Sequence, residues 1–234
     1  MWDTILENLS FIGVCLLFCT GIFLLAWALE CRLLPKRTSA VSRARHVAVL
    51  GLCSALSAVL MLFEIPLFFA PSFYQLDLSE LPVLICGFAM GPVAGVLCEL
   101  LKVILKILLK GTSTAFVGDF ANFLIGCTLV LPAATIYHYH KSRKTALIGL
   151  VLGSITMTVF GSALNAFYLI PQFSKLFGLP LDAIVGMGTA VNPAIHSLST
   201  LVLFAVVPFN LLKSLILTIL VMVLYKHIKR LLKI

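Results

Sequence analysis

Three polar residues interrupt apolar stretches in the second half of the chain. Asn165 lies in the segment LNAFYLIP, and Asn210 and Lys213 lie in VVPFNLLK. Because Asn210 and Lys213 are three residues apart, a helix would place both on one face. A polar side chain in an apolar environment persists when it is packed, paired or facing a cavity. Amides both donate and accept hydrogen bonds, so these residues are typical of a site that grips hydroxyl groups of a ligand.

A loop of unusual composition precedes them, Pro66 to Pro82 with the sequence PLFFAPSFYQLDLSELP. Loops normally face water, yet this one sets aromatic and leucine side chains, Tyr74 and Leu76 among them, beside Asp77 and Glu80. We interpret it as a lid that folds over a ligand. The lid and the polar residues together predict a pocket for a ligand with an aromatic body and a polar tail.

The position of the last helix decides whether these residues can meet. Proline suits a helix start, so we expect the last span to begin at Pro208. In that case Asn165, Asn210 and Lys213 all stand near the outer leaflet, within reach of the lid. In the alternative, the asparagines cap helix ends or bond across helices, and Lys213 extends to the outer surface.

Composition identifies the elements that must position these groups. Hydrophobic residues make up 61% of the chain, charged residues 11%, and the mean hydropathy is +1.13, which predicts an all-α integral membrane protein. A shorter apolar run, Leu81 to Gly91, is expected to be a tightly turned partner of the next helix and completes seven spans. The other six predicted spans are Ser10 to Leu29, His46 to Phe63, Pro92 to Leu109, Val117 to Tyr137, Ala146 to Ile170 and Pro208 to Tyr225.

The formal net charge of +8 is concentrated in three connecting or terminal segments. With seven spans these segments share one side, so the positive-inside rule predicts an outer N-terminus, a cytoplasmic C-terminus and an outward-facing lid. This clustering argues against nucleic acid as the partner. The basic residues are Arg32, Lys36, Arg37, Arg43, Arg45, Lys141, Arg143, Lys144, Lys226, Lys229, Arg230 and Lys233.

The chain lacks the motifs of the usual enzymes. It has no phosphate loop, no HExxH, no GxSxG and no CxxC, so no catalytic residue and no metal site is expected. Glu99 and Lys102, three residues apart, are expected to pair inside the bundle as structural groups. A membrane-embedded enzyme acting on a lipid or prenyl group remains the alternative from a different class.

Two further segments yield expectations. Gly51 and Ala55, like Ser54 and Ala58, are four residues apart and form a small-residue stripe that lets another helix approach, either within the chain or from a partner. The region from Phe173 to Val206 is expected to be irregular before a short apolar helix. The residues behind that expectation are Gly186, Gly188, Asn192 and Pro193.

Four stretches, in order and at compatible spacing, carry a family resemblance from about Arg45 to the C-terminus. They are FEIPLFFAPSFYQLDLSELPVLICGFAMGP, LLKGTSTAFVGDFANFLIG, LNAFYLIP and FAVVPFNLLK. The set resembles the riboflavin-binding S component (RibU type) of energy-coupling factor (ECF) vitamin transporters. The resemblance implies a six-helix bundle that captures riboflavin from outside. It also implies a transmembrane coupling subunit (EcfT type) and two ATPase subunits (EcfA type), which use the ATP, and no cofactor of its own.

The resemblance also assigns roles to residues. The lid would close over the isoalloxazine ring, polar residues of the later helices would hold the ribityl chain, and the Gly51 to Ala55 stripe would dock on the coupling subunit. Residues 46–234 would form the core, and residues 1–45 an additional N-terminal transmembrane helix with a basic linker. An S component for another vitamin, or for FMN or FAD, is the alternative. The implied riboflavin-binding residues are Asn165, Asn210, Lys213, Leu76, Asp77 and Tyr74.

Overall fold

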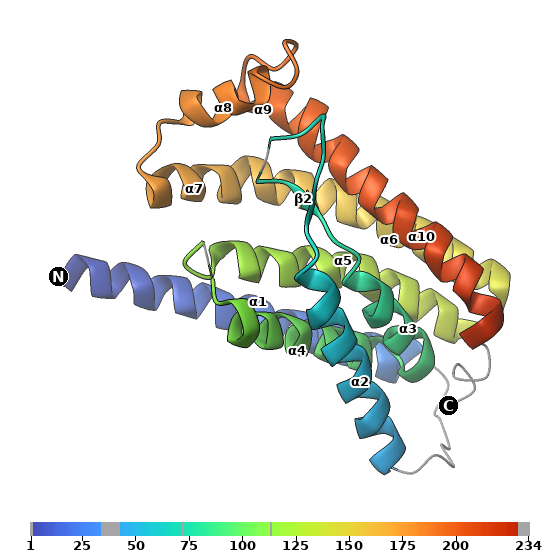
Figure 1. Cartoon of the computed structure of the whole chain (residues 1–234). Coiled ribbons are helices and arrows are strands. Elements are labelled where there is room, and N and C mark those ends of the chain that lie inside the picture. Colours follow the sequence, from blue (N-terminus) through green and yellow to red (C-terminus); the bar gives the residue numbers. More distant parts are fainter. Residues whose placement is uncertain (1, 34–42, 72, 113, 229–234) are drawn as a thin grey trace.

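The computed structural model describes residues 2–33, 43–71, 73–112 and 114–228, and most of these residues are helical (Figure 1). Two five-residue π-helical turns, η1 (Asn165–Leu169) and η2 (Val202–Val206), and two short strands, β1 (Ile65–Pro66) and β2 (Gln75–Leu76), complete the described elements. The helices are α1 (Trp2–Leu33), α2 (Arg43–Met61), α3 (Glu80–Met90), α4 (Pro92–Lys110), α5 (Val117–Tyr139), α6 (Arg143–Leu164), α7 (Ile170–Phe177), α8 (Leu181–Thr189), α9 (Leu198–Leu201) and α10 (Val207–Ile228).

The chain is an all-α, multi-pass membrane protein, as its composition predicts. Five helical stretches of the described residues are long and apolar enough to cross a bilayer. The predicted seven spans also counted α3, which has 11 residues, and α4, which carries Glu99, Lys102, Lys106 and Lys110. Several residues behind the predicted orientation lie outside the described residues, namely Lys36, Arg37, Lys229, Arg230 and Lys233.

The helices pack into a single bundle, in which α5 and α6 make the most extensive contact. In Figure 1, α6 and α10 run side by side, while α1, α4 and α5 lie together with α2 and α3 alongside. Apolar side chains of α3, α5, α6 and α10 form one core, and those of α1, α4 and α5 form another. A third apolar cluster joins the lid to α7, α8 and α10. The lid is therefore built into the packing of the end of the bundle where α7, α8 and the start of α10 lie.

The connection between α3 and α4 is a single glycine, as the predicted tight turn requires. Gly91 has φ of 116°, a conformation that side chains with a Cβ rarely adopt. Next to it, Glu30 of α1 accepts a hydrogen bond from the backbone N–H of Val93 at 3.1 Å. A carboxylate at a helix N-terminus satisfies a free N–H and complements the helix dipole. This contact fixes the end of α1 to the start of α4.

One boundary prediction is wrong, and one prediction of irregular structure is confirmed only in part. The last span does not begin at Pro208, because the helix runs without a break from Leu198 through η2 into α10. The wide turn of η2 ends where the proline, which has no N–H to donate, enters the helix. In the region after Phe173, Gly186 and Gly188 lie within the regular helix α8, whereas Asn192 and Pro193 lie in irregular structure before the short helix α9, as expected.

Candidate ligand-binding site

A cavity of about 720 Å³ lies beneath the lid, within the size range of small-molecule pockets. The lid, the adjoining ends of α4 and α5, η1, α7, α8 and α10 all contribute to its wall. Its lining residues from the lid and the adjacent ends of α2 and α3 are Met61, Glu64, Phe73, Tyr74, Gln75, Asp77 and Glu80.

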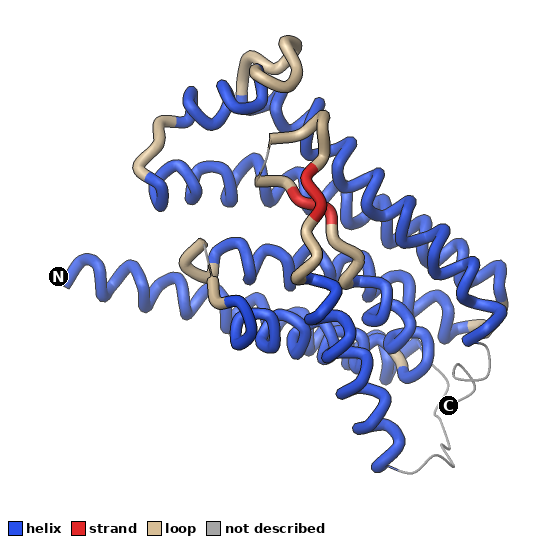
Figure 2. Tube along the Cα trace, in the orientation of Figure 1, coloured by secondary structure: helices blue, strands red, loops and turns tan. Residues whose placement is uncertain are grey.

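The lid crosses the cavity as a small hairpin. Its strands pair antiparallel, with Ile65 opposite Leu76 (Figure 2). The Tyr74 hydroxyl donates to Asn165 Oδ1 at 2.7 Å, and Asn165 Nδ2 donates to the Gly161 carbonyl at 2.8 Å. Burial raises the pKa of Tyr74, so its hydroxyl stays protonated as the donor. These bonds hold the tip of the lid against η1.

A buried ion pair fixes the other end of the lid. Lys213 Nζ lies 2.9 Å from Asp77 Oδ2 and 3.0 Å from Glu80 Oε1, and all three side chains are nearly inaccessible. Ser79 N donates to Asp77 Oδ1 at 2.9 Å. Burial raises the pKa of Asp77, but the Lys213 ammonium and the other favourable contacts outweigh it and lower the pKa to about 2. Asp77 is therefore ionised at neutral pH, and the lid carries a charge that α10 compensates.

The charged groups of α4 continue this network. Lys102 contacts Glu99 on its own helix and lies 3.4 Å from Glu80 Oε1, so the expected Glu99–Lys102 pair is present. Lys102 Nζ also donates to Asn122 Oδ1 at 3.2 Å. Glu99 and Lys102 belong to α4, whereas Glu80 belongs to α3, Asn122 to α5 and Lys213 to α10. The network therefore ties α3, α4, α5 and α10 together below the cavity.

A second set of ion pairs lies along the cavity toward the α4–α5 connection. Lys106 Nζ is 2.6 Å from Asp119 Oδ1. Lys110, at the end of α4, contacts Glu64, which immediately precedes β1. All four side chains line the cavity, and the Lys110–Glu64 pair links its wall to the start of the hairpin.

Asn210 offers an unused hydrogen-bond donor at the cavity. Its side chain is 2% exposed, and its Nδ2 has no hydrogen-bond partner among the described residues. A Cβ at position 161 would lie 3.0 Å from this nitrogen, so Gly161 leaves the amide the space to reach the cavity. A buried donor without an acceptor is unfavourable, and an acceptor on a ligand would satisfy it.

The predicted site residues meet, with one exception. Asn165, Asn210, Lys213, Asp77 and Tyr74 line the cavity. Leu76 is absent from the lining and belongs to the apolar cluster that joins the lid to α7, α8 and α10.

Sequence reasoning missed the polar contribution of α5 to this cavity. Asp119 and Asn122 are three residues apart on that helix, a spacing that could have shown that they share a face.

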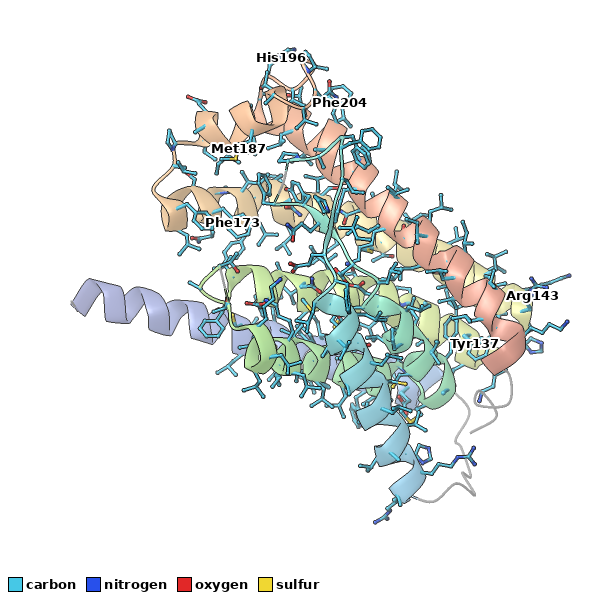
Figure 3. The ribbon with its side chains drawn as sticks, in the orientation of Figure 1. Tyr137, Arg143, Phe173, Met187, His196 and Phe204 are labelled. Carbon is cyan, nitrogen blue, oxygen red and sulfur yellow. The ribbon has the colours of Figure 1, made fainter. Side chains whose placement is uncertain are left out.

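The apolar wall comes from the region expected to be irregular. Figure 3 shows Phe173 of α7 and Met187 of α8 at the lid end of the molecule, with Tyr137 and Arg143 at the opposite end. Phe173, Phe177 and Met187 give the cavity an apolar, partly aromatic side. The cavity thus has a polar end on α10 and α5 and an apolar end on α7 and α8, which suits an aromatic ligand with a polar tail.

The small-residue stripe of α2 is divided between two environments. Gly51 and Ala55 are exposed, with open space around Gly51. Ser54 and Ala58 are buried within the chain, and Ser54 Oγ lies 3.4 Å from Cys98 Sγ of α4. The first pair is accessible to another helix, and the second pair packs inside the chain.

Known proteins are similar to this chain in both sequence and fold. The family described as "ECF transporter, substrate-specific component" matches residues 45–225. The riboflavin transporter RibU of Staphylococcus aureus (strain TCH60) is 31% identical over 189 residues, which cover 81% of this chain and 93% of the relative. The riboflavin transporter FmnP of Bacillus subtilis (strain 168) is 27% identical over 188 residues, with coverage of 80% and 93%.

A solved structure extends this similarity to the fold. It is described as "Structure and mechanism of the S component of a bacterial ECF transporter" and aligns with a TM-score of 0.64 and 30% identity. The alignment covers 82% of this chain and 100% of that one.

Proposed function

Because the chain belongs to the substrate-specific components of ECF transporters, we propose that it captures riboflavin in the cavity beneath the lid. The observation that carries this proposal is the buried, unsatisfied amide of Asn210 facing a cavity of about 720 Å³. A transport family accounts for the absence of enzyme motifs in the sequence, and the energy for uptake comes from the associated ATPase module.

The arrangement of the cavity matches the two parts of riboflavin. The isoalloxazine ring is apolar at one edge and would rest against Phe73 of the lid and Phe173 and Met187 of the opposite wall. The amides of Asn165 and Asn210 and the ammonium of Lys213 would bond the hydroxyl and carbonyl oxygens. Lys213 has three N–H donors, two of which point to Asp77 and Glu80, so one is left for the ligand.

The exposed face of α2 is proposed as the docking surface for the transmembrane coupling subunit of the EcfT type. Gly51 and Ala55 leave the helix surface flat, so a partner helix can approach closely. Two EcfA-type ATPases would act through that subunit. We also propose that the N-terminus is outside and the C-terminus cytoplasmic, and that residues 46–234 are the S-component core, with residues 1–45 an addition to it.

The absorbance spectrum of the purified protein tests the ligand directly. A copurified flavin makes the protein yellow. After denaturation, the flavin absorbance bands should be found in the small-molecule fraction. Another vitamin released in its place would contradict riboflavin as the ligand while leaving the transport class intact.

Titration by quenching of flavin fluorescence tests the site. Asn210→Ala should weaken riboflavin binding by about 1–3 kcal/mol, the range for removing one partner of a buried hydrogen bond. Asn192→Ala is the matched control, because Asn192 lies outside the cavity lining and should leave the affinity unchanged. Equal affinities for the two variants would place the ligand elsewhere.

A further inference from the structure

The charged side chains of the cavity do not balance. Four carboxylates and three lysines lie among its described lining residues, which leaves one negative charge in excess. The neighbouring Glu99–Lys102 pair lies outside the lining, and Lys102 also lies 3.4 Å from Glu80 Oε1. The carboxylates are Glu64, Asp77, Glu80 and Asp119, and the lysines are Lys106, Lys110 and Lys213.

Each of the three lining lysines already contacts a carboxylate. Lys213 lies 2.9 Å from Asp77 Oδ2. Lys106 lies 2.6 Å from Asp119 Oδ1, and Lys110 contacts Glu64. An anionic group on a ligand would therefore compete with a carboxylate of the protein for each of these ammonium groups.

The region around the α4–α5 connection would otherwise suit a phosphate. Lys106 and Lys110 lie one turn apart at the end of α4, and the hydroxyl residues Thr112 and Thr114 line the cavity just beyond them. Two ammonium groups and two hydroxyls are typical partners of phosphate oxygens. The protein's own carboxylates, Glu64 and Asp119, occupy the ammonium groups instead.

We propose that this charge arrangement makes the cavity select the neutral flavin over its 5′-phosphate, with Glu64 and Asp119 as the selectivity-determining residues. A phosphate monoester carries a charge of about −1.5 to −2 at neutral pH, so it meets repulsion from a negatively charged lining. The inference rests on riboflavin being the ligand. It adds that the site discriminates between flavins by the charge at the end of the ribityl chain.

Three ligands separate charge from size. The wild type in detergent is titrated with riboflavin, with riboflavin 5′-phosphate, and with riboflavin 5′-acetate, a neutral ester that also extends the 5′ position. The phosphate should bind at least about tenfold more weakly than riboflavin, and the acetate should lose much less, because like-charge repulsion acts only on the phosphate.

Two variants test the assigned residues. Glu64→Gln and, separately, Asp119→Asn should each lower the ratio of the phosphate and riboflavin dissociation constants by about threefold or more, because each frees a lysine and removes the excess charge. Asp182→Asn makes the same change of charge on α8 at an exposed residue outside the lining, and it should leave the ratio unchanged. Riboflavin binding by each variant reports that it is folded.

The outcomes divide cleanly. Equal affinity of the wild type for riboflavin and its phosphate overturns the inference, as does an acetate ester that binds as weakly as the phosphate, since size would then explain the exclusion. An unchanged ratio in both lining variants also overturns it. If the wild type does not bind riboflavin, the proposed function itself is contradicted. If it binds riboflavin but shows no selectivity, only the inference of this subsection is overturned.

Discussion

Replacing Lys213 by methionine should destabilise the protein strongly, because it would strand two buried carboxylates. The Lys213 ammonium is 2.9 Å from Asp77 and 3.0 Å from Glu80, and these side chains are 2–6% exposed. Breaking a buried pair by removing one partner costs about 3–5 kcal/mol. Lys102 lies 3.4 Å from Glu80 and keeps that group partly compensated, so we expect about 3 kcal/mol, arising mainly from Asp77.

Asp77→Asn should cost less. The asparagine oxygen can still accept from Ser79 N, and Lys213 keeps Glu80 as its partner, so the loss is about 1–2 kcal/mol, that of one charge-assisted hydrogen bond. The double variant removes both the ammonium and the carboxylate that depends on it. It should therefore be more stable than Lys213→Met alone, a sign of coupling that independent sites do not give.

Reversible unfolding in mixed micelles measures these free energies, with Lys175→Met as the matched control. Lys175 is exposed on α7 and outside the cavity lining, so its replacement should change stability by no more than about 0.5 kcal/mol. A Lys213→Met variant as stable as this control, or a double variant no more stable than Lys213→Met, would refute the argument that the lid is fixed by a buried ion pair.

Three further measurements follow from the structure. The stability difference between the wild type and Asp77→Asn should be constant from about pH 5 to 8. It should shrink in unfolding experiments only as the pH falls below 3.8 toward about 2, because Asp77 is ionised in the folded protein down to that range. Gly126→Ala should lower the free energy of unfolding by about 1–3 kcal/mol because its Cβ would overlap the Glu99 carboxylate, whereas Gly21→Ala, with open space around it, should be neutral or stabilising in the same assay. Gly51→Leu should leave riboflavin titration unchanged and abolish pull-down of the coupling subunit; a variant that is still pulled down would place docking on another face.

Local patterns in the sequence predicted most of the helices and the lid. The apolar runs were long enough to identify helices, and Gly91-Pro92 marked a turn that the structure confirms. The aromatic composition of residues 66–82 indicated a cover, which the structure places over a cavity. These signals succeed because each depends on residues that are close in the chain.

The partners within the site were harder to predict because they are distant in sequence. Lys213 and Asp77 were each expected to face a ligand, yet they bind each other across 136 positions. No local spacing encodes such a pair, nor the bond between Tyr74 and Asn165, which are 91 residues apart. The prediction that a helix starts at Pro208 failed for a different reason. The usual rule for proline assumes an α-helical turn before it, and the turn η2 is wider.

The two π-helical turns make the specificity of the cavity sensitive to chain length. In η1 the Ile170 N–H bonds the Asn165 carbonyl, and in η2 the Val207 N–H bonds the Val202 carbonyl, so each turn accommodates one residue more than an α-helix would. Deleting one residue from either turn would rewind it as α-helix; because the residue removed is the extra one, the helix beyond would keep its register and only the side chains within the turn would change places. A single codon deletion in η1, whose Asn165 and Leu169 line the cavity, could thus change which side chains face the ligand there while the rest of the wall keeps its sequence and place.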